Sequence, residues 1–449
     1  MTSLSAWAKK ALVSALALTR TTEYAARRVG PAPFLPALFV DRFTHLGGIA
    51  DAEFRAQLDA CRSFDDDRWS SYWQAIAGRH LARANAALTQ LGLPAADDLL
   101  AATDSELRAE LGARLSPAVS ILADRGPVAD PDAVAKFCAE HPGSAPAATA
   151  LDGLIKTMVY EFVAAWPGWT PRRLAAYERS HRLAELILTC LAPAMEMTIE
   201  PVRIPVPGGD VVRGYLMFPL DQGAARLPIV LCSNGIEGTL AELLLPMLTY
   251  RRSGLALFVM EMPGTYSYRQ PVAPAAEQVY SAVVDHLAAD PRVDDDRIGM
   301  LGVSFGAYWA TRMAAVEPRI SAAVANGAPA HRSFSSAAAL GLPEIMVSTL
   351  RNATGSASLH EMSGKLRELS LAHLYRYIDI PLLVINGAED TLLSTQDSID
   401  IAIGAPEAQL VLYAGDDHCA MGHGEQWSEL SVRFLREHLV TAERGVLSR

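Results

Sequence analysis

The chain has 449 residues, of which 50% are hydrophobic and 20% charged, and its formal net charge of -11 gives a pI near 5.5. This length exceeds the range of about 100 to 200 residues usual for one domain, so a core domain and a second unit are expected. The acidic balance argues against a nucleic-acid surface, because phosphate binding needs a basic face. We therefore expect a small molecule as partner, and the sequence leaves a homodimer open.

The N-terminus contains a short apolar stretch beside charged residues. Lys9 and Lys10 precede residues 11–18, which are mostly apolar, and Arg20 follows. A secretory signal would lead to a cleavage site between small residues, and a membrane span needs about 20 apolar residues. The sequence shows neither pattern, so we expect a cytoplasmic protein that does not bind a membrane.

The cysteines are few and scattered: Cys61, Cys138, Cys190, Cys232 and Cys419. An odd, sparse set without a C-x-x-C pair is typical of reduced thiols in a cytoplasmic protein. Cys419 adjoins His418, but adjacent side chains point apart and no third ligand is nearby. We therefore expect neither a metal nor a cofactor.

Residues 1–192 are rich in alanine and leucine, with apolar residues three and four positions apart, as in Phe54, Leu58 and Cys61. This spacing predicts amphipathic helices. Proline and glycine predict breaks between helices, and they cluster at residues 30–33, 92–94, 141–143 and 166–168. We expect a helical N-terminal cap domain over 1–192.

Aromatic residues gather in two places in this helical half: residues 69–73 and 160–169. Packing in the core of the cap is the expected role, because aromatic side chains dominate protein cores. The alternative is that some of them line an apolar substrate pocket.

From Met195 onward, short apolar runs alternate with helical segments. Residues 202–206 and 211–218, joined by 207–210, predict a β-hairpin. Runs rich in β-branched residues predict strands buried on both faces, and they occupy residues 229–232, 255–260, 298–303, 322–325, 382–385 and 410–413. The alternation predicts an α/β fold with a mostly parallel sheet, whose core we place at 193–330 and 378–449.

One connection in this half is too long for a loop. More than fifty residues separate the runs near Val324 and Leu382, and leucines recur at helical spacing toward the end of the segment. Connections of this length usually have a function. We expect a helical lid insertion over 331–377, which would build the substrate pocket together with the N-terminal helices.

The pentapeptide Gly302-Val303-Ser304-Phe305-Gly306 follows an apolar run and precedes a helical stretch. It matches the G-x-S-x-G nucleophile elbow, in which a strand turns sharply into a helix. The strained turn requires neighbours without side chains. Ser304 is therefore the predicted nucleophile.

A serine hydroxyl is a weak nucleophile unless a histidine takes its proton and a carboxylate orients that histidine. Asp390 follows the run 382–385, and His418 follows the last run, 410–413. The order Ser304, Asp390, His418 is that of α/β-hydrolases. We predict these three as the catalytic residues.

Other residues compete for two of these roles. Glu389 adjoins Asp390, but the Gly-x-x-Asp pattern after the strand favours the aspartate. His423 falls at the entry of the final predicted helix, and Asp416 and Asp417 are better read as loop-capping residues. Glu389 and His423 remain the alternatives.

The oxyanion hole is expected to combine the amide after the nucleophile with one from the loop after the third strand. These amides belong to Phe305 and to Ile236 in the loop 233–238, where glycines allow close backbone approach. Glu237 lies in the same loop. It could donate a proton to a leaving group, and the alternative is that it caps the helix predicted over 239–250.

The second half resembles the α/β-hydrolase superfamily. More narrowly, it resembles the FrsA-like esterase group, which includes 2,6-dihydropseudooxynicotine hydrolase and fungal polyketide-shortening hydrolases. The resemblance rests on residues 234–237, 299–308, 387–390 and 417–419, and on a helical N-terminal region of similar length. It implies substrates that are ketones or esters attached to aromatic rings, and a glutamate with a role at the position of Glu237. The loop begins with Asn234 rather than the His-Gly of many lipases, which argues against a simple lipase.

These features predict a serine hydrolase in secondary metabolism. It would cleave a bulky, mostly apolar ester, thioester or β-diketone, the last at a carbon-carbon bond. One alternative is a lyase, cyclase or acyl transferase that uses the same residues on a polyketide-like substrate. The other is a non-catalytic binding protein, since a fold does not dictate a function.

Overall fold

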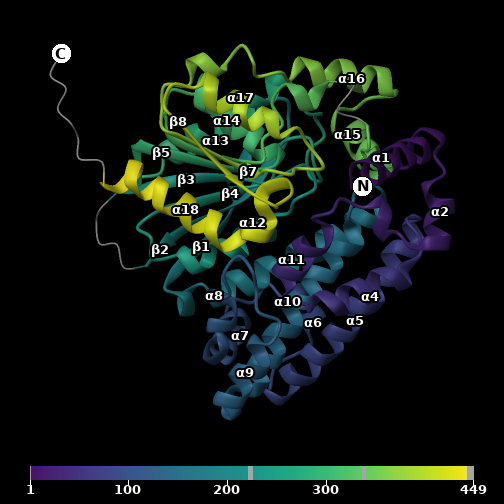
Figure 1. Ribbon diagram of the computed structural model, residues 1–449. Coiled ribbons are helices and arrows are strands. Elements are labelled where there is room, and N and C mark those ends of the chain that lie inside the picture. The colour runs from purple at the N-terminus through teal and green to yellow at the C-terminus, as the bar shows by residue number, and fades with distance from the viewer. Residues whose placement is uncertain (1, 221–225, 336–339, 442–449) are drawn as a thin grey trace. The chain divides into compact units, whose positions relative to one another are not determined.

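The structure, a computed structural model, describes residues 2–220, 226–335 and 340–441 (Figure 1). The chain forms two compact units. The first consists of Met1–Glu200, Ala241–Thr249 and Pro343–Val347, and the second of Pro201–Leu240, Tyr250–Leu342 and Ser348–Arg449.

This division differs from the expected boundaries, because the first unit extends to Glu200 and the expected insertion 331–377 is divided between the two units. Two short segments, Ala241–Thr249 and Pro343–Val347, group with the N-terminal helices. Each segment is held there by a carboxylate. Glu242 forms an ion pair with Arg42, with the Oε2 to Nη2 distance at 2.7 Å, and Glu344 accepts a hydrogen bond from the N–H of Thr22 at 3.2 Å. Such contacts between residues hundreds of positions apart leave no local pattern in the sequence.

The N-terminal part of the first unit is helical, as expected. Its α-helices are α1 (Thr2–Thr19), α2 (Thr22–Val29), α3 (Phe39–Gly47), α4 (Asp51–Cys61), α5 (Asp66–Gln90), α6 (Ala96–Ala101), α7 (Ser105–Leu115), α8 (Ser120–Ala123), α9 (Ala133–Glu140), α10 (Ala145–Ala165) and α11 (Pro171–Leu191). The four predicted breaks are confirmed, because α2, α5, α9 and α10 end just before the proline and glycine clusters.

Helices α5 and α10 pack closely at the centre of this unit. Gly153 makes the approach possible, because a β-carbon there would lie 2.9 Å from the carbonyl oxygen of His80 and from Cβ of Ala84. The indole N–H of Trp69 on α5 donates to the carbonyl of Val163 on α10 at 2.8 Å.

The aromatic residues of α3, α4, α5 and α10 form the core of this unit. Phe39, Phe54, Trp69, Trp73 and Tyr160 are all almost fully buried. Their rings touch one another, as in Phe54 and Trp73, whose centroids lie 5.3 Å apart. The expected packing role accounts for these residues.

The second unit contains an eight-stranded sheet of order β1-β2-β4-β3-β5-β6-β7-β8. The strands are β1 (Met197–Pro205), β2 (Val211–Pro219), β3 (Leu227–Ser233), β4 (Ala256–Met260), β5 (Val293–Val303), β6 (Ile320–Asn326), β7 (Leu382–Gly387) and β8 (Ala408–Tyr413). Strand β2 pairs antiparallel with β4, and the neighbouring strands from β4 to β8 pair in parallel. The expected mostly parallel sheet is confirmed.

Helices cover both faces of this sheet. Figure 1 shows α13 (Glu277–Ala288), α14 (Phe305–Val316) and α17 (Thr395–Gly404) on one face and α18 (Gly424–Arg436) on the other. The remaining α-helices are α12 (Leu240–Met247), α15 (Glu344–Ala353) and α16 (Leu359–Glu368). None of the described helices combines the length and the apolar character that crossing a bilayer demands.

The expected insertion corresponds to the connection between β6 and β7. It contains α15 and α16, and its residues 336–339 lie outside the described part of the chain. At its start, the buried Asp397 of α17 accepts hydrogen bonds from the N–H groups of Ala330, His331, Arg332 and Ser333, at 2.7 to 3.1 Å. The carboxylate thus orders the turn that leaves the sheet after β6.

Candidate active site

Ser304 lies at the abrupt turn between β5 and α14. Its backbone has φ 57° and ψ -123°, which residues with a β-carbon adopt only under constraint. A β-carbon on Gly302 would collide with the carbonyl of Gly306, and one on Gly306 would collide with the carbonyl of Ser233 at the end of β3. The two glycines therefore permit the sharp turn that exposes the serine hydroxyl.

The side chains of Ser304, His418 and Asp390 form a continuous chain of hydrogen bonds. Nε2 of His418 lies 2.9 Å from Oγ of Ser304, and Nδ1 lies 2.8 Å from Oδ2 of Asp390. The three residues follow β5, β8 and β7, so they lie beyond the C-terminal ends of parallel strands. The side chains of His418 and Asp390 are only 2% and 0% exposed. This geometry can transfer a proton from the serine hydroxyl to the imidazole.

The electrostatics favour an anionic Asp390. Burial by itself raises the pKa of this carboxyl, but the His418 imidazole and hydrogen bonds from the protein lower it overall. Two of these bonds come from the N–H groups of Leu392 and Leu393, at 2.9 and 2.8 Å.

The same surroundings favour a protonated His418. Burial lowers its pKa, whereas the Cys419 sulfur and the Asp390 carboxylate raise it, and the net pKa lies well above the ordinary histidine value. The pair therefore stabilises the imidazolium that forms when His418 accepts a proton.

The competing residues occupy other positions. The Glu389 side chain is exposed. Nδ1 of His423 lies 2.7 Å from Oδ2 of Asp416, just before α18, and Oδ1 of Asp417 accepts from the N–H of His418 at 2.8 Å. The two aspartates thus order the loop around His418, and the structure brings neither Glu389 nor His423 into the hydrogen-bond chain of Ser304.

The loop after β3 passes beside Ser304. A β-carbon on Gly235 would lie 2.8 Å from Cβ of Ser304, so this glycine allows the approach. The backbone N–H groups of Ile236 in this loop and of Phe305, the first residue of α14, donate to no other group among the described residues. Unengaged backbone donors around a nucleophile can bind an oxyanion.

Glu237 lies in this loop and is 3% exposed. Its Oε1 accepts a hydrogen bond from Oγ1 of Thr349 on α15, and its carbonyl accepts from the hydroxyl of Tyr266 at 2.8 Å. The N–H of Leu240, the first residue of α12, donates to Oε1 of Glu261 at 3.3 Å. Glu237 therefore links the loop to α15, and Glu261 accepts a hydrogen bond from the first residue of α12.

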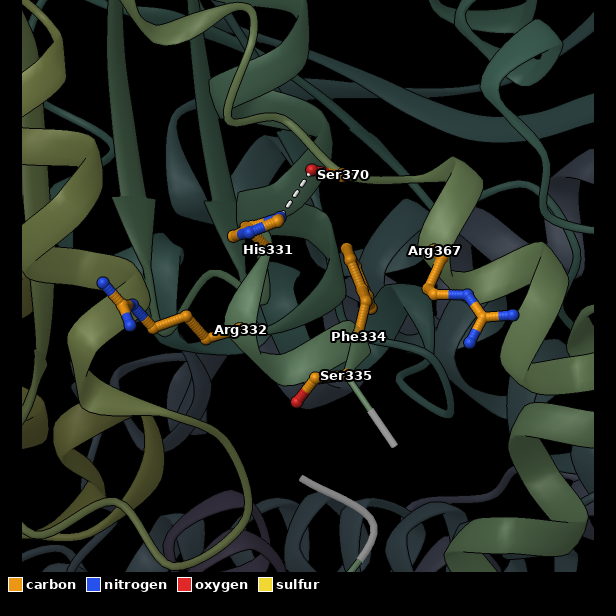
Figure 2. Close-up of a pocket in the computed structure, with 6 residues that line it drawn as sticks. All are labelled: His331, Arg332, Phe334, Ser335, Arg367 and Ser370. Carbon is orange, nitrogen blue, oxygen red and sulfur yellow. Dashed lines mark hydrogen bonds between the residues drawn. The ribbon is translucent and has the colours of Figure 1, made fainter. Parts of the chain in front are cut away.

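A cavity of about 440 Å³ lies at the start of the connection between β6 and β7. Figure 2 shows the residues that line it: His331, Arg332, Phe334, Ser335, Arg367 and Ser370. The Phe334 ring packs against Phe305, with centroids 6.0 Å apart. Phe334 therefore lines the cavity and also contacts the residue next to Ser304. The volume of the cavity falls within the range of about 300 to 1,000 Å³ typical of small-molecule sites.

In the described part of the chain, no three or more histidine, cysteine, aspartate or glutamate residues are placed to hold a metal ion.

Three further residues contact the site and were not predicted from the sequence. Thr349 contacts Glu237, and Asn326 and Asn386 contact the residues around His418 and Asp390. A signal existed for the asparagines, since each is followed by glycine directly after a predicted strand. Thr349 carries no comparable signal, because its contact with the loop arises only from the fold.

Comparison with known proteins places the chain in a family. A family model described as "Esterase FrsA-like" matches residues 139–412, more than half of the chain. Esterase FrsA of Vibrio parahaemolyticus is 23% identical over 259 residues, which cover 56% of this chain and 61% of that protein. The 2,6-dihydropseudooxynicotine hydrolase of Paenarthrobacter nicotinovorans is 26% identical over 268 residues, with coverages of 56% and 65%. Hydrolase LUC6 of a Fusarium species is 32% identical over 152 residues, with coverages of 30% and 35%.

Solved structures share the fold. The crystal structure of the 2,6-dihydroxy-pseudo-oxynicotine hydrolase matches with a TM-score of 0.65 and 19% identity, over 90% of this chain and 96% of that chain. AbyA5 matches with a TM-score of 0.56 and 22% identity, over 68% and 86%. The sequence matches, in contrast, cover less than two thirds of the length of each of the three relatives. The expected resemblance to the FrsA-like esterases is confirmed: the chain has the fold of α/β-hydrolases and belongs to the FrsA-like esterase family.

Proposed function

We propose that this chain is a serine hydrolase in which Ser304 attacks the carbonyl carbon of a bulky, mostly apolar substrate. The observation that carries the proposal is the unbroken hydrogen-bond chain from Oγ of Ser304 through His418 to Asp390. A serine hydroxyl becomes a competent nucleophile when a histidine, itself oriented by a buried carboxylate, removes its proton. The esterase description of the family supports the same reaction class.

The proposed reaction begins when Oγ of Ser304 bonds to the carbonyl carbon and His418 accepts the hydroxyl proton. The carbonyl electron pair moves to its oxygen, which the N–H groups of Phe305 and Ile236 would stabilise, each by about 3 kcal/mol. Collapse of this intermediate expels the leaving group, which takes the proton from His418. Water, deprotonated by His418, then releases the acyl group and restores Ser304.

The leaving atom would be the oxygen of an ester, the sulfur of a thioester or a carbon of a β-diketone. The cavity near Phe334 offers room for a bulky group. A relative named for the hydrolysis of 2,6-dihydropseudooxynicotine supports a substrate that carries an aromatic ring. A carbon leaving group is a poor one, so a second acid would help to protonate it. Glu237 is our candidate for that acid or for a substrate contact, because it is buried beside the nucleophile.

A fluorophosphonate probe tests the nucleophile. We expect the wild-type protein to be labelled and to hydrolyse p-nitrophenyl butyrate, and Ser304→Ala to lose both activities. Full turnover by Ser304→Ala would contradict the proposal, and absence of labelling in the wild type would favour a binding protein. Reaction in isotopically labelled water separates hydrolysis from acyl transfer or cyclisation, because only hydrolysis places the label in the acid product.

A further inference from the structure

Two parallel strands of the sheet end in the same dipeptide, Asn-Gly. Asn326 is the last residue of β6, and Asn386 is the penultimate residue of β7. The two residues are 0% and 1% exposed. Burial of a carboxamide is unfavourable unless hydrogen bonds compensate it. Both side chains form hydrogen bonds, although Oδ1 of Asn326 has no partner among the described residues.

Asn386 links the loop of the acid to the loop of the base. Its Nδ2 donates to Oδ2 of Asp390 at 2.9 Å, which is the oxygen that faces Nδ1 of His418. Its Oδ1 accepts from the N–H of Cys419, the residue after His418, at 3.0 Å and from the N–H of Gly387 at 2.9 Å. A carboxamide can donate and accept at once, whereas an aspartate there would only accept.

Asn326 holds the same peptide from the other side and also contacts the nucleophile. Its Nδ2 donates to the carbonyl of Cys419 at 2.9 Å. Its own carbonyl accepts from the N–H of Ser304 at 2.7 Å. The backbone of Cys419 is therefore held at its N–H by one asparagine and at its carbonyl by the other.

The backbone at this point needs such support. Cys419 and Ala420 have φ values of 61° and 50°, a left-handed conformation that residues with a β-carbon adopt only when their surroundings impose it. The turn directs His418 between Ser304 and Asp390. Release of the turn would move the imidazole away from one or both partners.

We propose that Asn326 and Asn386 are positioning residues, which hold the turn after His418 so that its imidazole contacts Ser304 and Asp390 together. This inference rests on the proposed serine hydrolase function. The asparagines touch no reacting atom and act only through His418 and Asp390.

The first test compares Asn386→Asp, which keeps the shape and the acceptor, with the wild type. We expect kcat for p-nitrophenyl butyrate to fall by about 100-fold, because a small misplacement of a catalytic group has effects of this order. KM should change by less than about twofold. A second buried carboxylate facing Asp390 should lower the thermal midpoint, so both proteins are assayed well below the midpoint of the variant. Asn352→Asp, at an exposed position of α15, is the matched control and should keep wild-type kinetics. A wild-type kcat in Asn386→Asp overturns the inference.

The second test is a double-mutant cycle between Asn386→Ala and Asp390→Asn. Residues that act as one unit are strongly non-additive. We expect Asn386→Ala to lower kcat by about 100-fold in the wild type but by less than about threefold when Asp390 is already replaced. An equal loss in both backgrounds would show a general structural effect and would overturn the inference. If Asn386→Ala does not fold, Asn326→Ser, which weakens the bond to the Cys419 carbonyl, replaces it in the cycle.

The Ser304→Ala variant distinguishes failure of the proposed hydrolase function from failure of the positioning role alone. If this variant keeps full turnover, the proposed function fails, whatever the asparagine variants do. If it is inactive while Asn386→Asp and Asn386→Ala keep the wild-type kcat, the function stands and only the positioning role fails.

Discussion

His418 connects Ser304 to Asp390, and its protonation state should control the rate. Burial lowers the pKa of His418, but Cys419 and the Asp390 carboxylate raise it to a net value well above that of an ordinary histidine. The neutral base form therefore becomes available only at a higher pH. We therefore expect kcat/KM to rise with pH, with a midpoint above the ordinary histidine pKa of about 6.5. The midpoint of the kcat/KM profile gives the pKa of His418 in the protein without bound substrate.

Asp390→Asn should change both the height and the position of that profile. With the carboxylate removed, the pKa of His418 falls, so the acidic limb should move to lower pH. The plateau should fall by about 10,000-fold, because the amide cannot hold the reactive tautomer. A pH series of p-nitrophenyl butyrate hydrolysis measures both quantities. If the midpoint of the acidic limb is the same in Asp390→Asn and in the wild type, Asp390 is not the partner of His418 in solution.

Glu237 can have one of two roles beside the oxyanion loop: it can hold the loop in place, or it can donate a proton to the leaving group. If Glu237 only holds the loop through Thr349, Glu237→Gln should keep activity within about threefold, since an amide oxygen still accepts that hydrogen bond. If Glu237 donates a proton, Glu237→Gln and Glu237→Ala should both lose at least about 100-fold.

We expect the loss in both variants for a substrate with a carbon leaving group, together with near wild-type hydrolysis of p-nitrophenyl butyrate by Glu237→Gln. An activated ester needs no acid, because its leaving group departs unprotonated. Full activity of both variants on a β-diketone substrate would remove Glu237 from the mechanism.

At the scale of elements, two glycines of the packed pair α5 and α10 should respond to substitution in opposite ways. Gly153→Ala on α10 would press its new methyl group against His80 and Ala84 of α5, and we expect a loss of about 1 to 3 kcal/mol in the free energy of unfolding. Gly78→Ala on α5 meets no atom within 4 Å, and the gain in helix propensity should stabilise by up to about 1 kcal/mol. Urea unfolding of both variants provides the comparison.

The connection between β6 and β7 contributes both to the cavity and to the surroundings of Glu237. Asp397 orders its first turn. Its Phe334 both lines the cavity and contacts Phe305, and Thr349 on its helix α15 contacts Glu237. Its role as a lid remains a prediction.

At the scale of the whole molecule, the reactivity of the cysteines shows whether the fold protects their thiols from solvent reagents. All five are free in the structure, with Cys61, Cys232 and Cys419 buried. Burial raises the pKa of Cys61 and of Cys232 to about 12, so neither forms the reactive thiolate near neutral pH. We expect Ellman's reagent to react quickly with at most Cys138 and Cys190 in the native protein.

After unfolding without a reductant, all five thiols should react. A smaller number would indicate a disulfide, which the reduced state in the structure does not contain. The cytoplasmic location, the small apolar partner and the state of assembly remain predictions at this scale.

Much of the fold could be predicted from the sequence, because strands and helix ends are specified by residues that are close together in the chain. Buried parallel strands are short apolar runs, and each of the eight strands overlaps a predicted segment. The expectation of burial on both faces is wrong for β8, which is the edge strand of the sheet and is partly exposed. Proline and glycine end helices by removing donors or freeing the backbone, so the breaks near Gly92 and Trp166 were predicted correctly. Ser304, Asp390 and His418 could be named because each follows a strand, and parallel strands bring their C-terminal ends to one edge of the sheet.

Other features were decided by the tertiary structure alone. The pairing of Glu242 with Arg42, the contact of Thr349 with Glu237 and the left-handed turn at Cys419 depend on side chains that are distant in the sequence. No periodicity or short motif encodes such contacts, because their free energy arises only when the packed elements exclude water around them. The sequence by itself determined which residues could do the chemistry, and the packing of strand ends and loops decided that His418 faces both Ser304 and Asp390.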